Sequence, residues 1–169
     1  MKWAVHPLGP PDCHYVNAVS GWLDLGNPQE ALAELRRVSP GVAESPAVLD
    51  LAWRVHAALR DWPSALAVSQ RMVRLAPSQP AGWVNHSYAL HELRRTQEAW
   101  EHLLPAADQF PEVPTVPYNL ACYACQLGDR AAARVWLERA AKILGPGQLK
   151  KMALSDPDLL PLRGWIDAL

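Results

Sequence analysis

Small and apolar residues recur at a fixed spacing along this chain. The pattern is plainest in residues 117–144, where two segments of helical length, rich in Ala and Leu, flank the turn Leu-Gly-Asp. Alanines in the second segment of four such pairs follow one another at intervals of 34 residues: Ala31, Ala65, Ala99 and Ala133. This period, with helix–turn–helix character, is typical of solenoids built from stacked repeats. The sequence therefore predicts an all-α repeat architecture, which indicates a binding role.

The period divides most of the chain into four units, each with two helices and a turn about midway. The predicted units are residues 12–45, 46–79, 80–113 and 114–147. Each turn contains a glycine suited to a left-handed conformation, a helix N-cap residue, or both. The residues expected in these roles are Gly26, Asn27, Pro28 and Glu30 in unit one, Asp61 in unit two, Thr96 in unit three, and Gly128 and Asp129 in unit four.

These units resemble the tetratricopeptide repeat (TPR) family, which places an aromatic residue, Leu-Gly and Tyr on the first helix and Ala, a Phe-like residue, Ala and Pro on the second. The matching residues are Tyr15, Trp22, Ala31, Leu35 and Val38 in unit one, Ala65, Met72 and Pro77 in unit two, Trp83, Ala99, Leu103, Ala106 and Pro111 in unit three, and Leu120, Ala121, Ala133, Leu137 and Ala140 in unit four. The resemblance implies a right-handed α–α superhelix, a solenoid of four TPR hairpins in a single domain, residues 1–169. Small residues at the helix crossings are expected to let the backbones approach closely.

Several positions depart from the TPR pattern. Trp53 stands where the family has a small residue, His86 where it has Leu, and Ser69 at the Phe-like place. Units two and three are therefore expected to stack at a slightly unusual angle. Pro105 falls inside the second helix of unit three, so a kink or an early break is expected there.

The two ends of the chain lie outside the repeat pattern. Residues 1–11 are a leader without helical period, in which Trp3 and Val5 either pack on the first repeat or lie loose. Residues 145–148 are expected to break the period, and residues 150–154 to form a short helical turn. Residues 148–169 are interpreted as an end cap, because the last repeat would otherwise expose its stacking face. A final helix capped by Asp156 is expected to have these apolar residues on one side: Leu159, Leu162, Trp165, Ile166 and Leu169.

Composition narrows the class of partner. Of the 169 residues, half are hydrophobic and 20% are charged, which disfavours a disordered chain. The balance of 16 Lys and Arg against 17 Asp and Glu lacks the basic excess of most nucleic-acid-binding proteins. No apolar stretch is long enough for a signal peptide or a membrane span, and three cysteines fit a reducing compartment. The chain is therefore predicted to be cytoplasmic, with neither nucleic acid nor membrane as partner.

In TPR arrays the first helix of every unit lines the concave surface, so the resemblance implies a peptide-binding groove there. The residues at the groove positions are Asn17, Ser20, Asp50, Arg54, Trp83, Asn85, Tyr88, His91, Tyr118, Asn119 and Cys122. Asn recurs at one place in three units, and its amide can both donate to and accept from a peptide backbone. The alternative is that these amides bond neighbouring helices and stabilise the stack. Trp83, Tyr88 and Tyr118 are the candidate aromatic anchors.

The predicted function is a non-enzymatic scaffold that binds an unidentified protein or peptide, without cofactor or metal. Arg54 is the only cation at the groove positions, so the clamp with which some TPR modules hold the carboxylate of a chaperone tail is incomplete. One alternative is a structural protein that self-associates, for example as a homodimer. No phosphate-binding loop, catalytic triad or pair of carboxylates predicts an enzyme.

Cys122 and Cys125 form a Cys-X-X-Cys pair, which leaves a thiol redox protein as a further alternative. A redox pair lies at a helix N-terminus, where the helix dipole lowers a thiol pKa, whereas this pair falls in the middle of a predicted helix. Packing is therefore the favoured interpretation. His86 and His91 lack a convincing second pair of zinc ligands, and His86 is interpreted as an interior, hydrogen-bonded histidine.

Overall fold

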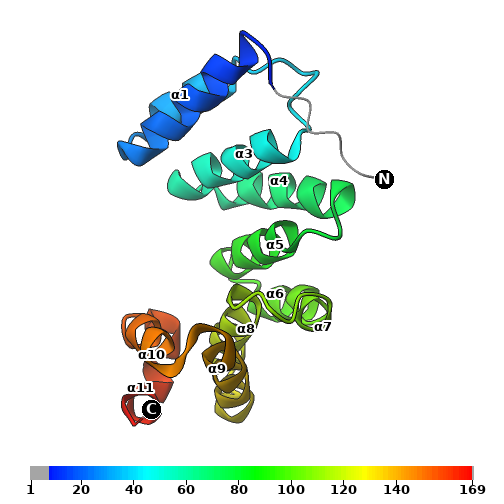
Figure 1. Cartoon of the computed structure of the whole chain (residues 1–169). Coiled ribbons are helices and arrows are strands. Elements are labelled where there is room, and N and C mark those ends of the chain that lie inside the picture. Colours follow the sequence, from blue (N-terminus) through cyan, green and yellow to red (C-terminus); the bar gives the residue numbers. More distant parts are fainter. Residues whose placement is uncertain (1–7, 169) are drawn as a thin grey trace. The chain divides into compact units, whose positions relative to one another are not determined.

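The chain is all-helical in the computed structural model, which describes residues 8–168 (Figure 1). Within these residues no strand is present. The helices form two compact units, one ending at Ala76 and the other starting at Pro77. Helix pairs begin at Asp12, Pro46, Pro80 and Thr115, at intervals of 34, 34 and 35 residues. Trp3 and Val5 of the leader, and Leu169, lie outside the described residues.

The first unit consists of two helical hairpins. Its helices are α1 (Asp12–Asp24), α2 (Pro28–Leu35), α3 (Pro46–Ala58) and α4 (Trp62–Leu75). Val19 of α1 and Ala31 of α2 pack with Leu51 and Val55 of α3, so the two hairpins share a core. A second cluster joins α3 to α4 through Leu49, Ala52, Val68 and Met72. The hairpins of this unit are therefore held together by apolar side chains from both helices of each pair.

The second unit consists of two further hairpins and a C-terminal region. Its elements are α5 (Pro80–Glu92), α6 (Thr96–Leu103), α7 (Ala106–Gln109), α8 (Thr115–Gln126), α9 (Arg130–Leu144), α10 (Pro146–Leu154), the 3-10 helix η1 (Pro157–Leu162) and α11 (Arg163–Asp167). The second helix of the third hairpin ends at Leu103 and resumes at Ala106, which confirms the break predicted at Pro105. Proline removes a helical N–H donor and clashes with the preceding turn, and this accounts for the interruption.

A residue in the left-handed region ends the first helix of every hairpin. These residues are Gly26, Arg60, Arg94 and Gly128, with φ values of 71°, 57°, 63° and 89°. In each case the next amide reaches back to a carbonyl five residues earlier, for example from Asn27 to Trp22 at 2.8 Å and from Asp129 to Ala124 at 2.9 Å. This is the Schellman arrangement, which satisfies the last carbonyls of a helix. The backbone geometry of the turn is therefore the same in all four hairpins, even where arginine replaces glycine.

Three of the four N-caps predicted at the hairpin turns are confirmed. Asn27, Asp61 and Asp129 each accept a hydrogen bond from the backbone amide three residues later. The prediction for Thr96 is wrong, because the residue at the cap position is Arg95, whose side chain makes no capping bond. Thr96 is instead the first residue of α6, and its hydroxyl lies 3.0 Å from Nδ1 of His91.

The alanines that reveal the period are fully buried in the second helices of their hairpins. Ala31, Ala65, Ala99 and Ala133 are all 0% exposed. Ser69, at the Phe-like place of its unit, is also buried, and its hydroxyl donates to the carbonyl of Leu66 within α4. Small side chains at these points let paired helices approach, as the sequence pattern predicts.

The C-terminal region differs in detail from its prediction. Gly145, with φ 85°, ends α9, and α10 starts at Pro146, so the short helical turn predicted at residues 150–154 is the second half of a nine-residue helix. The predicted final helix is divided into η1 and α11. Asp156 does cap η1, by accepting from the amide of Asp158. Leu159, Leu162 and Ile166 are buried, as the apolar pattern predicts, and Trp165 is half-buried.

Candidate functional site

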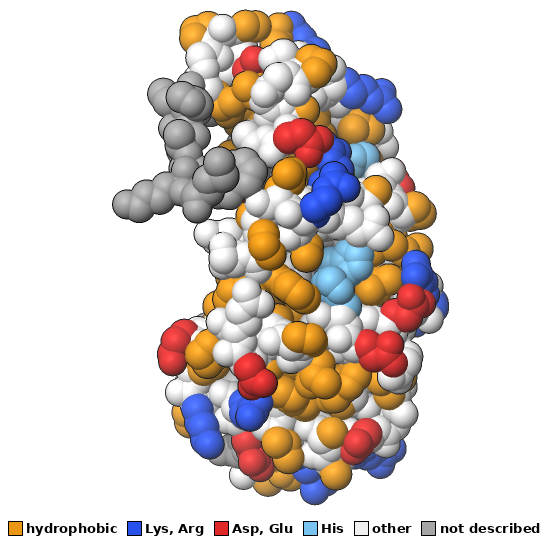
Figure 2. Space-filling model, turned by 90° about the vertical axis from the view of Figure 1, so that its right-hand side faces the viewer, with side chains coloured by type: hydrophobic (Ala, Val, Ile, Leu, Met, Phe, Trp, Pro, Cys, Tyr) orange, Lys and Arg blue, Asp and Glu red, His pale blue; other side chains and the backbone are white. Residues whose placement is uncertain are grey.

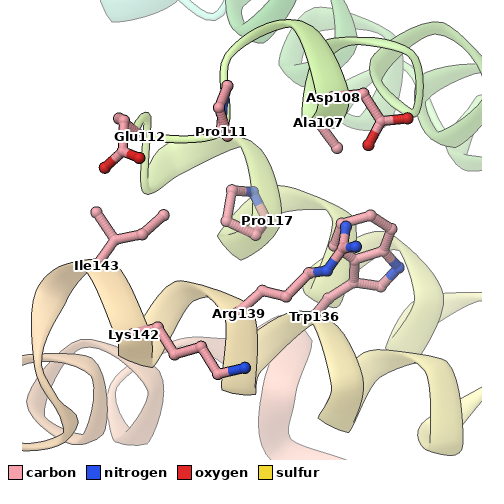
Figure 3. Close-up of a pocket in the computed structure, with 9 residues that line it drawn as sticks. All are labelled: Ala107, Asp108, Pro111, Glu112, Pro117, Trp136, Arg139, Lys142 and Ile143. Atoms are coloured by element: carbon pink, nitrogen blue, oxygen red, sulfur yellow. The ribbon is translucent and has the colours of Figure 1, made fainter.

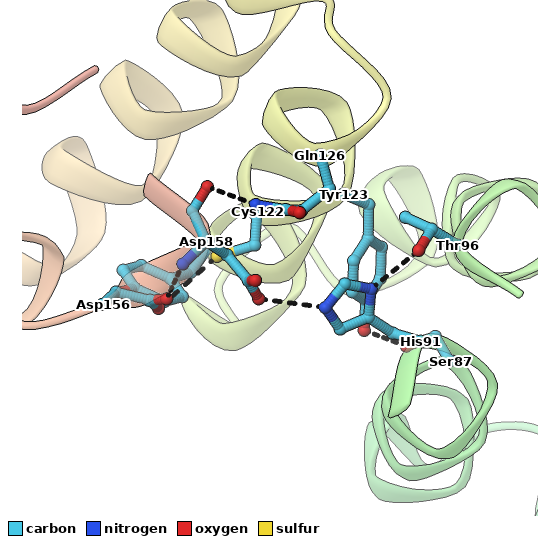
Figure 4. Close-up of polar contacts among 9 residues, drawn as sticks. Ser87, His91, Thr96, Cys122, Tyr123, Gln126, Asp156 and Asp158 are labelled. Carbon is cyan, nitrogen blue, oxygen red and sulfur yellow. Dashed lines mark hydrogen bonds and ion pairs between the residues drawn. The ribbon is translucent and has the colours of Figure 1, made fainter. Parts of the chain in front are cut away.

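Three side chains from the first helices of the second unit hold the segment at residues 156–162 (Figure 4). The hydroxyl of Tyr118 on α8 donates to Oδ2 of Asp156 at 2.8 Å. Nε2 of His91 on α5 lies 3.0 Å from Oδ2 of Asp158, and the amide of Gln126 donates to the backbone carbonyl of Asp158 at 2.9 Å. With Cys122, these side chains form what we call the docking face: His91, Tyr118, Cys122 and Gln126.

The residues of the segment itself direct both carboxylates at the docking face. Oδ1 of Asp156 accepts from the amide of Asp158, while its Oδ2 remains for Tyr118. Pro157 occupies the first position of η1, where its fixed φ favours the start of a helix. Leu159 and Leu162, which follow the carboxylates, are 0% and 2% exposed. Local capping and apolar burial therefore present the two acids in one defined arrangement.

His91 is fixed in orientation by contacts on both sides of its ring. Nδ1 lies 3.0 Å from the hydroxyl of Thr96, and the ring centroid lies 5.0 Å from that of Tyr123. A carboxylate only accepts hydrogen bonds, so Nε2 carries the proton toward Asp158, and in the neutral ring Nδ1 accepts from Thr96. Tyr123 in turn donates to Oγ of Ser87, which donates to the carbonyl of Val84. The network thus extends from α6 through α5 and α8 to η1.

Burial keeps the hydroxyl and thiol groups of the site protonated. It raises the pKa of Tyr118, and the neighbouring Cys122 and Asp156 raise that pKa further, so the hydroxyl stays a donor. Burial also raises the pKa of Cys122 well above the usual thiol value, and the carboxylates of Asp156 and Asp158 add to this. The thiol lies 3.6 Å from Oδ2 of Asp156 and acts as a weak donor.

The Cys-X-X-Cys pair has the environment of a packed core. Cys122 and Cys125 are buried free thiols in α8, away from the helix N-terminus. Burial also raises the pKa of Cys125. A reactive cysteine requires a lowered pKa and access to solvent. The geometry therefore supports the packing interpretation.

Three of these side chains have the proximity that a metal ion needs. One potential ligand atom each from Cys122, Asp156 and Asp158 lies within 4.8 Å of the other two. A thiolate and two carboxylates are among the kinds of ligand that bind a divalent cation such as zinc. Each of the three nevertheless takes part in a hydrogen bond of the network, so these contacts account for the arrangement without an ion.

The structure places the predicted groove residues in several environments. His91, Tyr118 and Cys122 belong to the docking face. Tyr88 on α5 is 37% exposed. Partial burial raises its pKa to about 12, and the negative charge of Glu92 contributes to the shift. The amide of Asn119 bonds the hydroxyl of Tyr123. Asn85 is half-buried on α5; in the first unit Asn17 and Arg54 are exposed, and Ser20 and Asp50 are half-buried.

Trp83, the third candidate aromatic anchor, makes contacts within its own hairpin and with the connection before it. Its indole Nε1 donates to the carbonyl of Pro77 at 2.9 Å. Its ring stacks on His102 of α6, with centroids 5.0 Å apart. His102 also lies against His86, at 4.1 Å between centroids. Trp83 is thus engaged with the connection before α5 and with the second helix of its own hairpin.

Sequence reasoning missed Gln126, Asp156 and Asp158 as parts of the site. Asp156 was expected to cap a helix, and it does, but its second carboxylate oxygen binds α8. Gln126 is the last residue of α8 and lies one position before the turn, outside the expected groove positions. The spacing of two acids around one proline is the signal in the sequence that could have drawn attention to this segment.

A separate cleft of about 490 Å³ lies in the second unit between α9 and the connection from α7 to α8 (Figure 3). Trp136, Arg139 and Lys142 of α9 line one side, and the guanidinium of Arg139 lies 4.7 Å from the centroid of Trp136. Asp108 and Glu112 lie across the cleft. Its walls thus carry both signs of charge, and none of its residues is among the predicted groove positions.

One face of the molecule carries charges of both signs. On the face shown in Figure 2, Lys and Arg side chains are interspersed with Asp and Glu, and no large area of one sign is present. A phosphate backbone is bound by clustered positive charge. That face therefore does not have the clustered positive charge of a phosphate-binding surface.

None of the helices within residues 8–168 has the length and apolar character needed to cross a bilayer. No protein-family model and no curated protein matches the sequence. Among solved structures, the chain is similar to a protein described as the MamA RS-1 ArsTM double mutant, with a TM-score of 0.72, 17% identity, and coverage of 95% of this chain and 92% of that one. It is also similar to TTC0263, a thermophilic TPR protein of Thermus thermophilus, with a TM-score of 0.67, 18% identity, and coverage of 94% and 100%. Together with the helical hairpins described above, these similarities show that the chain has an all-α, TPR-like repeat fold.

Proposed function

We propose that this chain is a non-enzymatic scaffold that binds a peptide or a partner helix on the first helices of its hairpins. The docking face supports the proposal, because side chains of α5 and α8 already hold a short segment of the chain at residues 156–162. Peptide recognition commonly combines directional hydrogen bonds from the receptor with burial of apolar side chains of the peptide, and the segment has both, since its Leu159 and Leu162 are buried. Three of the predicted groove residues, His91, Tyr118 and Cys122, belong to that face.

The proposal extends to first-helix positions outside the docking face. Asn17 and Arg54 in the first unit and Tyr88 in the second are exposed, so a partner can reach them. We further propose that all four hairpins act as one domain in the reducing cytoplasm. Free Cys13, Cys122 and Cys125 are consistent with that compartment. The proposed partner is a protein or peptide, and neither a nucleic acid nor a membrane.

Site-specific photo-crosslinking in the source cell tests this function. A benzophenone amino acid would replace Tyr88 or Asn17 on first helices and, as a control, the exposed Val135 on the second helix α9. We expect one or a few protein adducts from the first two positions and not from Val135. An identical pattern from all three positions would contradict the proposal. Adducts with the mass of two copies of the chain would favour the self-associating alternative.

A further inference from the structure

We infer that residues 156–162 act as an internal ligand of the docking face, and that the partner segment which replaces them carries the same chemistry. That chemistry is two acidic side chains separated by one residue, with a leucine directly after the second acid. This inference rests on the proposed function, because it names the kind of segment that the scaffold binds.

The hydrogen-bonding character of the docking face supports an acidic occupant. Tyr118 and Cys122 donate to Asp156, His91 donates to Asp158, and Gln126 donates to the carbonyl of Asp158. All four protein groups therefore serve as donors, and the bound segment supplies only acceptors. A lysine or arginine in place of either aspartate would bring further donors and leave these groups without acceptors. The face therefore selects carboxylates.

The apolar part of the segment fixes the register of the acids. Leu159 and Leu162 are almost fully buried, whereas Leu160 between them is 56% exposed. η1 contacts α8 as well as α9 and α10, so the leucines are seated beside the carboxylates in the same unit. A competing segment needs an apolar residue directly after its second acid to occupy the position of Leu159. Acidic composition without that leucine would not be sufficient.

Competition within the chain makes the affinity for an external segment depend on how often the internal one leaves. The apparent dissociation constant equals the intrinsic one divided by the fraction of molecules with the face uncovered. Asp158 is partly open to solvent, with 31% of its side chain exposed, whereas His91 is buried. Weakening the aspartates of the chain should therefore raise the uncovered fraction without altering the donors of the face.

The test uses a fluorescent peptide of residues 155–167 and the full chain. Asp156→Asn with Asp158→Asn in the chain keeps a side-chain oxygen that can cap η1 but weakens both contacts with the face. We expect this double variant to bind the peptide at least tenfold more tightly than the unaltered chain, by fluorescence anisotropy. Adding His91→Ala and Tyr118→Phe should abolish the gain. A peptide with both aspartates replaced by asparagine should bind at least tenfold more weakly to the double variant.

The matched control removes two carboxylates elsewhere in the same unit, by Asp108→Asn with Glu112→Gln in the separate cleft, and should bind the peptide like the unaltered chain. Asp158→Asn alone, which leaves the Asp156 cap of η1 and every donor of the docking face in place, provides a milder variant if circular dichroism shows that the double variant loses helix. Equal peptide affinity of the altered and unaltered chains, or no effect of the asparagines in the peptide, would overturn the inference. So would a dimer of the double variant by light scattering, because the occupant would then be the segment of a second copy. Adducts with other proteins at Tyr88, together with failure of the peptide, would refute this inference and leave the proposed function standing.

Discussion

His91 and Asp158, 67 residues apart in the sequence, meet through a 3.0 Å contact between Nε2 and Oδ2. The contact joins α5 of the third hairpin to the start of η1, across the side of α8. Thr96, at the start of α6, orients the imidazole from its other nitrogen. The C-terminal region is therefore fastened to two successive hairpins by polar contacts as well as by its buried leucines.

Asp158→Ala should loosen η1. The change leaves the buried His91 without its acceptor, and loss of such a charge-assisted bond costs about 1–3 kcal/mol. Amide hydrogen exchange should become faster in η1 and α11, while exchange in α1–α4 stays unchanged. Asp167→Ala is the control, because it removes an exposed carboxylate from the same region of the chain. Equal exchange in the two variants would show that the contact with His91 contributes nothing to the docking of η1.

Arg94→Gly should stabilise the protein, and Gly128→Ala should destabilise it. Both residues have a left-handed backbone, which costs a non-glycine residue about 1–2 kcal/mol. Glycine offsets part of this gain by increasing the entropy of the unfolded chain by about 0.4–1 kcal/mol. We therefore expect a net gain of up to about 1 kcal/mol for Arg94→Gly and a comparable loss for Gly128→Ala, from urea unfolding. Gly147→Ala, at a glycine without positive φ, is the control substitution.

Stability should decrease as the pH falls from about 6.5 toward 4, and His86→Leu should reduce this dependence. Burial lowers the pKa of His86 from 6.5 to about 4, and the charge of His102 contributes to the shift. Between these values the unfolded chain binds a proton that the folded chain does not, so acid favours unfolding. Above pH 6.5 the histidine is neutral in both states and contributes no slope. Unfolding by urea at a series of pH values measures the effect; parallel curves for the variant and the parent would contradict it.

The thiols of Cys122 and Cys125 should react slowly with Ellman's reagent at neutral pH, and more slowly than Cys13. Burial raises the pKa of both, so the nucleophilic thiolate is scarce. Cys13 is only partly buried, in α1. Unfolding in urea should equalise the three rates. Rapid reaction of either buried thiol at pH 7 would revive the redox alternative.

The repeat architecture could be predicted because it depends on local chemistry that recurs. The alanines at the helix crossings, the caps at Asn27, Asp61 and Asp129, and the break at Pro105 follow from rules that involve a few neighbouring residues. Thr96 was assigned to the wrong role because the sequence suits both a cap and a first helical residue. His91, five residues earlier, engages its hydroxyl.

The docking face depends on contacts that no local pattern contains. The family pattern predicts that His91, Tyr118 and Cys122 share the side of the first helices, but not that residues 156–162 cover it. Asp156 offered a local role as a cap, which concealed its second role as an acceptor for Tyr118. Residues 156–162 reach the docking face only after the chain has turned between α9 and α10. This turn is at Gly145, whose positive φ suits glycine. The direction that the chain takes after this turn depends on packing against other helices, which the local sequence does not reveal.

The order of synthesis has a consequence for the contact between Gln126 and Asp158. Gln126 completes α8, and Asp158 follows 32 residues later. At ribosomal rates of about 5–20 residues per second, roughly 2–6 s separate the two residues during translation. Until the end of that interval the nascent third and fourth hairpins lack Asp156 and Asp158, which accept from Tyr118 and His91 in the finished chain. Under the inference above, an external acidic segment therefore has no internal competitor for the docking face of the nascent chain until Asp156 and Asp158 are added.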